Sequence, residues 1–418
     1  MVGGVAVEKA RPRVSWQWLW SPRADLYWNL IPFWLGFLLL GALWWTRDGG
    51  TTPDSPGWHF TFAGEEVSVM VLAFTLYGPL IDGPHLWATI ARTYVDADEW
   101  AVRRWLFISS LLALVLGPAM ILLPYVINAV LPLSADKLDW GFIAWSWAFG
   151  TYALYHINKQ HWGFVCLYKR KNGDNDARES RIDAYFFNIA IWAPYVAMVY
   201  APWDPTKPKS VVESTVFTAC HAVFLTITVA YIGFQVAQWR KGAVRNGPKL
   251  VYMATVLSLY YLTFAFDPRV AAFWVLITST GHCLQYHAVV WAYGTKKYGA
   301  KDPASRKLPN IIFDNLWLYI LLGIAYALIT LQGPGANTFK RITSEVMHSA
   351  VFSHTFTYLD QHGGVELGLK ILAAFISGVR LHHFYVDSKI WRVSKSATLA
   401  KNLDVTIPQQ ASVAPPAE

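Results

Sequence analysis

Apolar runs of about 20 residues recur along the whole of this 418-residue chain. A helix rises about 1.5 Å per residue, so a run of this length crosses the roughly 30 Å hydrocarbon layer of a bilayer. Only 15% of the residues are charged, against about 25% in a typical soluble domain. The runs therefore predict an all-α fold, a polytopic membrane helix bundle.

The apolar runs divide the chain into ten predicted transmembrane helices, which form a single bundle domain over residues 1–403. The predicted spans are 28–46, 67–91, 104–131, 139–168, 183–201, 214–239, 249–267, 269–295, 311–332 and 365–388. Residues 404–418 are rich in proline, alanine and serine, which is typical of a disordered tail.

The distribution of basic residues predicts how the bundle is oriented. Most of the 35 lysines and arginines lie at the N-terminus, in alternate loops and after the last span. Cytoplasmic loops carry such an excess, so both termini are expected in the cytoplasm of a multi-pass protein of the cell (inner) membrane. Because the basic residues form short clusters between spans, membrane lipids are the expected surroundings and nucleic acid is not an expected partner.

Seven of the twelve histidines are predicted near the cytoplasmic ends of four spans. They are His85 on the second span, His156 and His161 on the fourth, His282 and His287 on the eighth, and His382 and His383 on the tenth. At helical rise, one histidine of each span lies about 9 to 14 Å inside the basic residues that close it: His85, His161, His287 and His383. Ionisable groups are costly in a bilayer and usually face the bundle interior, so these imidazoles are expected to meet.

Two carboxylates accompany the histidines. Asp82 precedes His85 by three residues and Asp387 follows His383 by four, so each pair shares a helix face. Imidazole and carboxylate together form the ligand set of iron, zinc or manganese. Asp82 and Asp387 are therefore predicted either as metal ligands or as groups that orient the histidines.

The spacing within two histidine pairs leaves two arrangements open. His156 and His161 are five residues apart, as are His282 and His287, and five helical steps leave two side chains about 140° apart. Either a π-bulge brings each pair into line, or the two members serve different metal positions, which the number of ligands favours. A lone membrane histidine such as His221 is instead expected to be a structural core residue.

Two neighbours of the histidines are candidate catalytic residues. Tyr286 stands beside His287, and Gln160 stands beside His161. Both can hydrogen bond within a metal site, and the tyrosine can also relay a proton.

The placement of the seven histidines resembles the membrane-bound histidine-motif diiron oxygenases, the class of fatty-acid desaturases and of lipid and alkane hydroxylases. The resemblance implies two irons, dioxygen as oxidant, an external electron donor and an apolar or lipid substrate at the cytoplasmic side. The chain departs from that class because its pairs are five residues apart, where the class shows HxxxH and HxxHH motifs.

The expected function is that of an integral-membrane non-haem metal oxidoreductase, most simply diiron, that hydroxylates, desaturates or cleaves an apolar substrate. An external electron donor is needed because the sequence shows no Walker loop, no GxGxxG after a strand and no CxxC cluster. Another divalent metal remains open as cofactor. Two other classes also remain open, a haem-binding electron-transfer protein and a proton-coupled transporter that uses histidine and aspartate.

Overall fold

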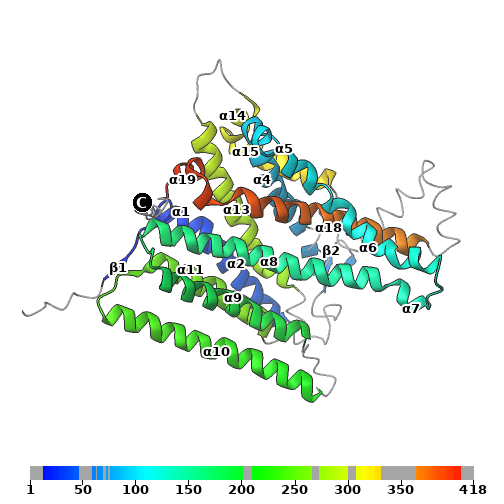
Figure 1. The fold of residues 1–418 in the computed structure, drawn as a ribbon, viewed down its shortest axis with the longest axis horizontal. Coiled ribbons are helices and arrows are strands. Elements are labelled where there is room, and N and C mark those ends of the chain that lie inside the picture. The colour runs from blue at the N-terminus through cyan, green and yellow to red at the C-terminus, as the bar shows by residue number, and fades with distance from the viewer. Residues whose placement is uncertain are drawn as a thin grey trace, which may run out of the picture. The chain divides into compact units, whose positions relative to one another are not determined.

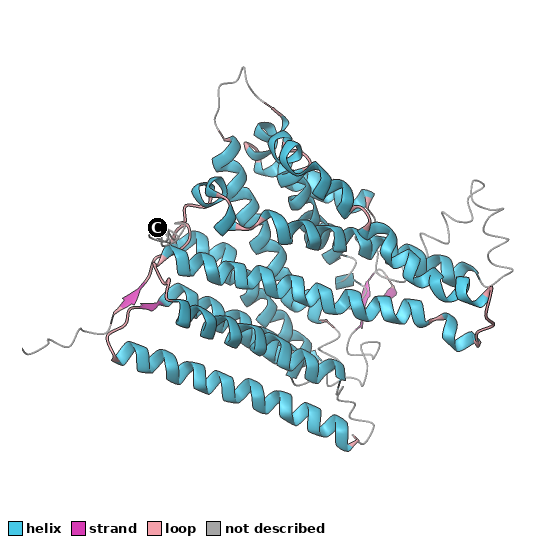
Figure 2. Ribbon diagram, viewed as in Figure 1, coloured by secondary structure: helices cyan, strands magenta, loops and turns pink. Residues whose placement is uncertain are grey.

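The computed structural model is almost entirely helical over the residues that it describes (Figure 2). Those residues are 13–46, 59–62, 64–68, 72–73, 76–200, 210–265, 273–299, 307–330 and 364–405. The predicted tail, apart from its first two residues, lies outside this range.

Each of the ten predicted spans overlaps a helix of the described residues (Figure 1). Four helical stretches are long and apolar enough to cross a membrane: Pro22–Trp45, Ala97–Asn128, Ala177–Tyr200 and Val211–Arg240. These four stretches indicate a membrane protein.

The chain forms two compact units, and each is built from separated parts of the sequence. Unit 1 comprises residues 1–51, 158–282 and 404–418, and unit 2 comprises residues 52–157 and 283–403. The boundaries between the units fall inside two long helices, α8 (Trp140–Lys171) and α13 (Trp274–Tyr298).

Unit 1 contains a set of helices and one short parallel strand pair. The elements are α1 (Pro22–Asp25), η1 (Leu26–Leu30), α2 (Ile31–Thr46), α9 (Ala177–Tyr200), α10 (Val211–Arg240), α11 (Gly247–Ala265), β1 (Val14–Ser15) and β4 (Arg245–Asn246). Helix α9 packs against α10 and α11, and α11 packs against α2. A capping box formed by Ser210 and Glu213 begins α10.

The outer surface and the interior of unit 1 suit a membrane protein in different ways. Apolar side chains of α10 are exposed, Val211 to 83% and Val229 to 71%, which suits contact with hydrocarbon. Inside, the Asp183 carboxylate is fully buried and is bound by Lys169 and Lys249, at 2.8 and 2.9 Å. Burial of these charges is tolerable because each has an opposite partner.

Unit 2 contains a β-hairpin and the helices that carry most of the predicted metal ligands. The elements are β2 (His59–Phe62), β3 (Glu65–Ser68), η4 (Gly78–Asp82), α4 (Gly83–Thr93), α5 (Ala97–Ser110), α6 (Ala113–Asn128), α7 (Ala135–Leu138), α14 (Leu308–Phe313), α15 (Leu316–Ile329), α18 (Gly364–Ile390), η6 (Val393–Lys395) and α19 (Ala397–Asn402). Helix α18 packs against α4, α5 and α6, and α15 packs against α4.

Two glycines allow α18 and α6 to approach closely. A Cβ atom at Gly378 would lie 2.7 Å from the Ala113 carbonyl oxygen, and one at Gly117 would lie 2.9 Å from the Ala374 Cβ. Small residues at such crossings are typical of membrane helix pairs. This contact fixes the position of α18, which carries two of the predicted ligands, His383 and Asp387.

Candidate metal centre

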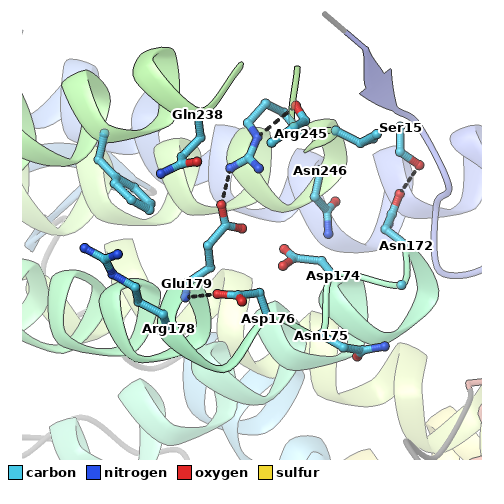
Figure 3. Close-up of a pocket in the computed structure, with 14 residues that line it drawn as sticks. Ser15, Asn172, Asp174, Asn175, Asp176, Arg178, Glu179, Gln238, Arg245 and Asn246 are labelled. Atoms are coloured by element: carbon cyan, nitrogen blue, oxygen red, sulfur yellow. Dashed lines mark hydrogen bonds and ion pairs between the residues drawn. The ribbon is translucent and has the colours of Figure 1, made fainter. Parts of the chain in front are cut away.

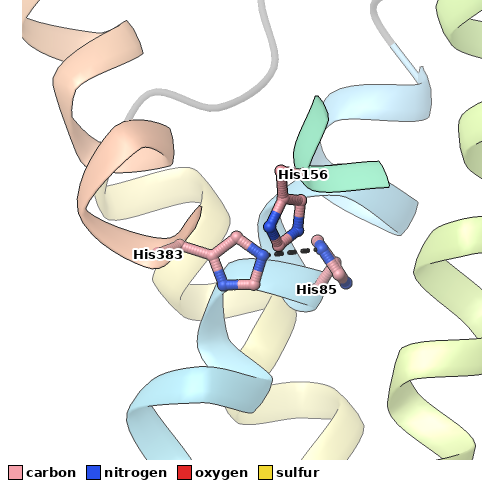
Figure 4. A group of neighbouring side chains, drawn as sticks. All are labelled: His85, His156 and His383. Carbon is pink, nitrogen blue, oxygen red and sulfur yellow. Dashed lines mark hydrogen bonds between the residues drawn. The ribbon is translucent and has the colours of Figure 1, made fainter. Parts of the chain in front are cut away.

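Three histidines of unit 2 come together from three helices that are distant in sequence. His85 lies on α4, His156 on α8 and His383 on α18 (Figure 4). One ring nitrogen of each lies within 4.8 Å of the corresponding nitrogens of the other two. All three side chains are buried, with exposures of 2%, 7% and 2% respectively. The group can hold one metal ion.

The closest contact in this group joins His85 and His383, whose Nε2 atoms are 2.9 Å apart. Two ring nitrogens at this distance need a shared proton or a cation between them. With metal-to-nitrogen bonds of about 2.1 Å, a 2.9 Å separation corresponds to an angle of about 90° at the metal. That angle suits neighbouring ligands of an octahedral ion.

A hydrogen-bond network holds the ring of His383 in place. The hydroxyls of Thr89 and Tyr286 each donate to Asp387 Oδ1 at 2.7 Å. Thr89 Oγ1 also lies 2.7 Å from His383 Nδ1 and 2.7 Å from the Tyr286 hydroxyl. Thr89 therefore occupies Nδ1 of His383, and Nε2 is the nitrogen that faces His85.

Tyr286 lies directly against this group. Its ring centroid is 4.7 Å from that of His85, and its hydroxyl accepts a hydrogen bond of 3.1 Å from Trp391 Nε1. Tyr286 thus lines the site and also ties α13 to α18.

Two further predicted histidines of unit 2 have other partners. His287 Nδ1 lies 3.0 Å from the Tyr319 hydroxyl. The ring centroid of His287 is 6.5 Å from that of His85. His382 Nε2 lies 2.8 Å from the Tyr94 hydroxyl. Neither histidine belongs to the group of three.

The two predicted carboxylates are also in different surroundings. The Asp82 carboxylate is bound by the Arg380 guanidinium, so it does not join the histidine group. Asp387 joins the network of Thr89 and Tyr286 and lies beside His383.

The other three predicted site residues, His161, His282 and Gln160, form a separate group in unit 1. The ring centroids of His161 and His282 are 5.8 Å apart. The ring nitrogens of His161 lie 2.9 and 3.2 Å from the hydroxyls of Tyr252 and Tyr260. Gln160 donates to the backbone carbonyl of His282 at 2.8 Å.

The structure distinguishes between the two arrangements considered for the five-residue spacing. Helices α8 and α13 are regular α-helix through both pairs, with no π-bulge at 156–161 or at 282–287. The members of each pair accordingly face different neighbours. One π-helical segment, Gly78–Asp82, directly precedes α4 and His85.

Sequence reasoning missed Thr89, Tyr252, Tyr260 and Trp391. Thr89 had a usable signal, because it follows His85 by four residues and so shares its helix face. The other three contact the predicted residues only through the tertiary fold.

No protein-family model, no curated protein and no solved structure matches this chain. The geometry of the site must therefore carry any functional argument.

A polar cavity of about 430 Å³ in unit 1 is a second candidate site (Figure 3). It is lined by the segments between α8 and α9 and between α10 and α11, together with residues of β1, α9 and α10. Most of its central charges are paired within the unit: Arg245 binds Glu179 at 2.6 Å, and Asp174 binds Lys169 and Lys249 at 2.8 and 2.7 Å. This pairing favours a structural role for the lining.

Proposed function

We propose that this protein is an integral-membrane metalloenzyme that uses a non-haem metal, iron in the first instance, and dioxygen to oxidise an apolar substrate. The observation that supports the proposal is the buried group of His85, His156 and His383, whose ring nitrogens lie within 4.8 Å of one another. Three imidazoles from three helices, close enough to bind one ion, suit a metal that keeps open positions for other ligands.

The ion and the protein chain contribute different parts of the proposed reaction. A bound iron supplies the activation of dioxygen. The chain supplies the ligands, orients the His383 ring through the contact of Thr89 with Nδ1, and excludes water by burial. In a hydroxylation, one oxygen atom enters a C–H bond and the other leaves as water. The substrate provides two electrons, and an external donor provides two electrons and two protons.

The number of ions is also part of the proposal. The three histidines of unit 2 account for one ion. A second iron remains a prediction that rests on the other histidines. A haem is less well supported, because axial histidine nitrogens lie on opposite sides of the iron, about 4 Å apart, whereas His85 and His383 are 2.9 Å apart.

The proposed topology is a ten-span bundle of the cell membrane with both termini in the cytoplasm. The helices that overlap all ten predicted spans support it, as does the excess of lysine and arginine in alternate loops. With this orientation the three histidines lie toward the cytoplasmic side, where an electron donor has access.

Metal analysis of the detergent-purified protein tests the proposed function. We expect bound iron in the wild type and its loss in His156→Ala, because one of three ligands is removed. His221→Ala is the matched control on α10, and it should keep its metal and elute at the same volume. A wild type without metal, or full retention in His156→Ala, contradicts the proposal.

A further inference from the structure

A series of ring contacts leads from the histidine group to the end of α18. The buried Tyr286 ring has its centroid 4.7 Å from that of His85 and 5.5 Å from that of His383. Trp391, which directly follows α18, is half-buried, and its Nε1 donates to the Tyr286 hydroxyl at 3.1 Å. One tyrosine and one tryptophan thus connect two of the three histidines with a side chain that is partly exposed.

The neighbours of Trp391 hold its ring in this position. The Arg92 guanidinium lies 4.6 Å from the centre of the Trp391 ring and 4.3 Å from that of the Tyr293 ring. Arg92 is itself buried and pairs with Glu99 at 3.3 Å. Because electron tunnelling falls steeply with distance, a fixed contact between Trp391 and Tyr286 makes a short path for an electron.

The segment that contains Trp391 is basic. Residues 388–403 include no acidic residue and four basic residues: Lys389, Arg392, Lys395 and Lys401. The last three are exposed, and none of the four forms an ion pair within the part of the chain that the structure describes. With the proposed orientation, this segment lies on the cytoplasmic side.

The acidic residues at the start of the neighbouring helix α5 do not cancel this charge. Asp96 binds Lys297 at 2.5 Å. Glu99 binds Arg103 at 3.0 Å in addition to Arg92. These carboxylates are therefore already neutralised by other basic residues, and the charge of residues 389–401 is open to a partner.

We propose that residues 389–401, the docking segment, bind an acidic one-electron carrier protein, and that Trp391 and Tyr286 conduct the electron to the metal centre. This inference rests on the proposed function and identifies the kind of donor that it needs. Each carrier molecule is oxidised by one electron as iron(III) is reduced to iron(II). Two carrier molecules thus supply the two electrons that a hydroxylation takes from its donor.

Charge complementarity and the position of Trp391 together favour this partner. A basic segment steers an acidic protein toward it and speeds their encounter. Anionic lipid headgroups are also attracted to basic residues beside a span. A lipid, however, has no use for a tryptophan that contacts the metal centre through Tyr286, whereas an electron carrier does.

Carrier binding to the purified full-length protein tests the docking segment. Plant-type [2Fe–2S] ferredoxin and flavodoxin, two acidic soluble carriers, serve as fluorescently labelled probes. The double variant Arg392→Glu/Lys395→Glu should weaken binding by about 10-fold or more, and added salt should weaken binding to the wild type. Lys137→Glu is the control. Lys137 is exposed on α7, on the opposite side in the proposed topology, so this variant should bind as the wild type does.

The outcomes separate this inference from the proposed function. Equal binding by the wild type and the double variant, or no binding of either carrier, would overturn the docking segment and leave the histidine centre standing. If the double variant binds the carriers normally but loses copurifying anionic phospholipid, the segment binds lipid instead. A wild type that binds a carrier but no metal would overturn the proposed function and leave the docking segment standing.

The rate of electron transfer tests the role of Trp391. On rapid mixing of the reduced carrier with the iron-loaded protein, absorbance reports oxidation of the carrier. Trp391→Leu should slow this oxidation severalfold while carrier binding stays unchanged. Trp105→Leu is the control, because Trp105 lies on α5 in the same unit and is 70% exposed. A Trp391→Leu protein that holds iron and accepts electrons at the wild-type rate would overturn the path.

A second variant covers the case in which Trp391→Leu does not assemble. Trp391→Phe keeps an aromatic ring but loses the N–H group that donates to Tyr286. It should also slow electron transfer, by a smaller factor. A wild-type rate in this variant would likewise overturn the path.

Discussion

His382 and His383 are adjacent in the chain, yet only His383 joins the group of three histidines. Neighbouring residues of a helix point about 100° apart, so two adjacent side chains cannot face one ion. His383 meets His85 and His156, whereas His382 meets the Tyr94 hydroxyl. At the scale of the residue, the direction of a side chain around its helix decides whether it joins the histidine group.

Charged residues at the edge of unit 1 show a second effect at this scale. Burial of Asp174 acts to raise its pKa, but the ammonium groups of Lys249 and Lys169 outweigh burial and leave the pKa below its ordinary value of 3.8. A lowered pKa means that the ionised group stabilises the fold above that ordinary value. The contribution is lost as the pH falls through the lower, folded pKa.

We therefore expect unit 1 to lose stability as the pH falls below about 3.8. Asp174→Asn should lower the melting temperature at pH 7, because two buried lysines lose a partner, and it should flatten the acid dependence. Thermal unfolding in detergent between pH 7 and pH 3 measures both effects.

The control for this prediction is Asp176→Asn. Asp176 is exposed and accepts from the Glu179 backbone amide, a role that asparagine also performs. This variant should follow the acid dependence of the wild type. An equally flattened profile in both variants would argue against a specific effect of the Lys169 and Lys249 pairs.

At the scale of the element, the packing of α18 positions its part of the histidine group. The helix carries His383 and Asp387, and its contact with α6 depends on Gly378. A methyl group at Gly378 would meet the Ala113 carbonyl and the Leu114 backbone at 2.7 and 2.8 Å. Because these neighbours are backbone atoms, α18 must move.

Gly378→Ala should accordingly destabilise the protein by about 1–3 kcal/mol and weaken metal binding. Gly368→Ala is the matched control on the same helix, since a Cβ there meets no atom within 4 Å. It should be neutral or stabilise by up to about 1 kcal/mol, as alanine favours helix. Unfolding in detergent and cobalt titration measure the two quantities, and equal behaviour of the variants would contradict the role assigned to the α6 contact.

The five-residue spacing also belongs to the element scale. The sequence predicted that His156 and His161 would point about 140° apart unless the helix contained a π-bulge. Helix α8 is regular, and His156 joins the group in unit 2 while His161 lies between two tyrosines in unit 1. The regular geometry of the helix alone therefore makes the two histidines of each pair face different neighbours. The partners of each histidine were not predictable, because they come from other helices.

At the scale of the whole molecule, topology is the testable property. Reporter fusions measure it directly. A fluorescent protein fused to the C-terminus should be fluorescent in the cytoplasm, because the tail follows an even number of proposed spans. Alkaline phosphatase fused after Ser134, between the third and fourth proposed spans, should be active outside. The opposite pattern would contradict the proposed orientation.

The sequence by itself determined that this is a helical membrane protein, and it identified the residues that are candidate metal ligands. Apolar runs of membrane length predict helices because lipid offers the backbone no hydrogen-bond partner, and polar residues within such runs are rare enough to be informative. Only the tertiary structure decided which candidates meet. His85, His156 and His383 converge, while Arg380 binds Asp82 and Tyr94 meets His382. These contacts depend on how each helix rotates and slides when it packs against its neighbours, and side-chain shape at the crossings sets that packing.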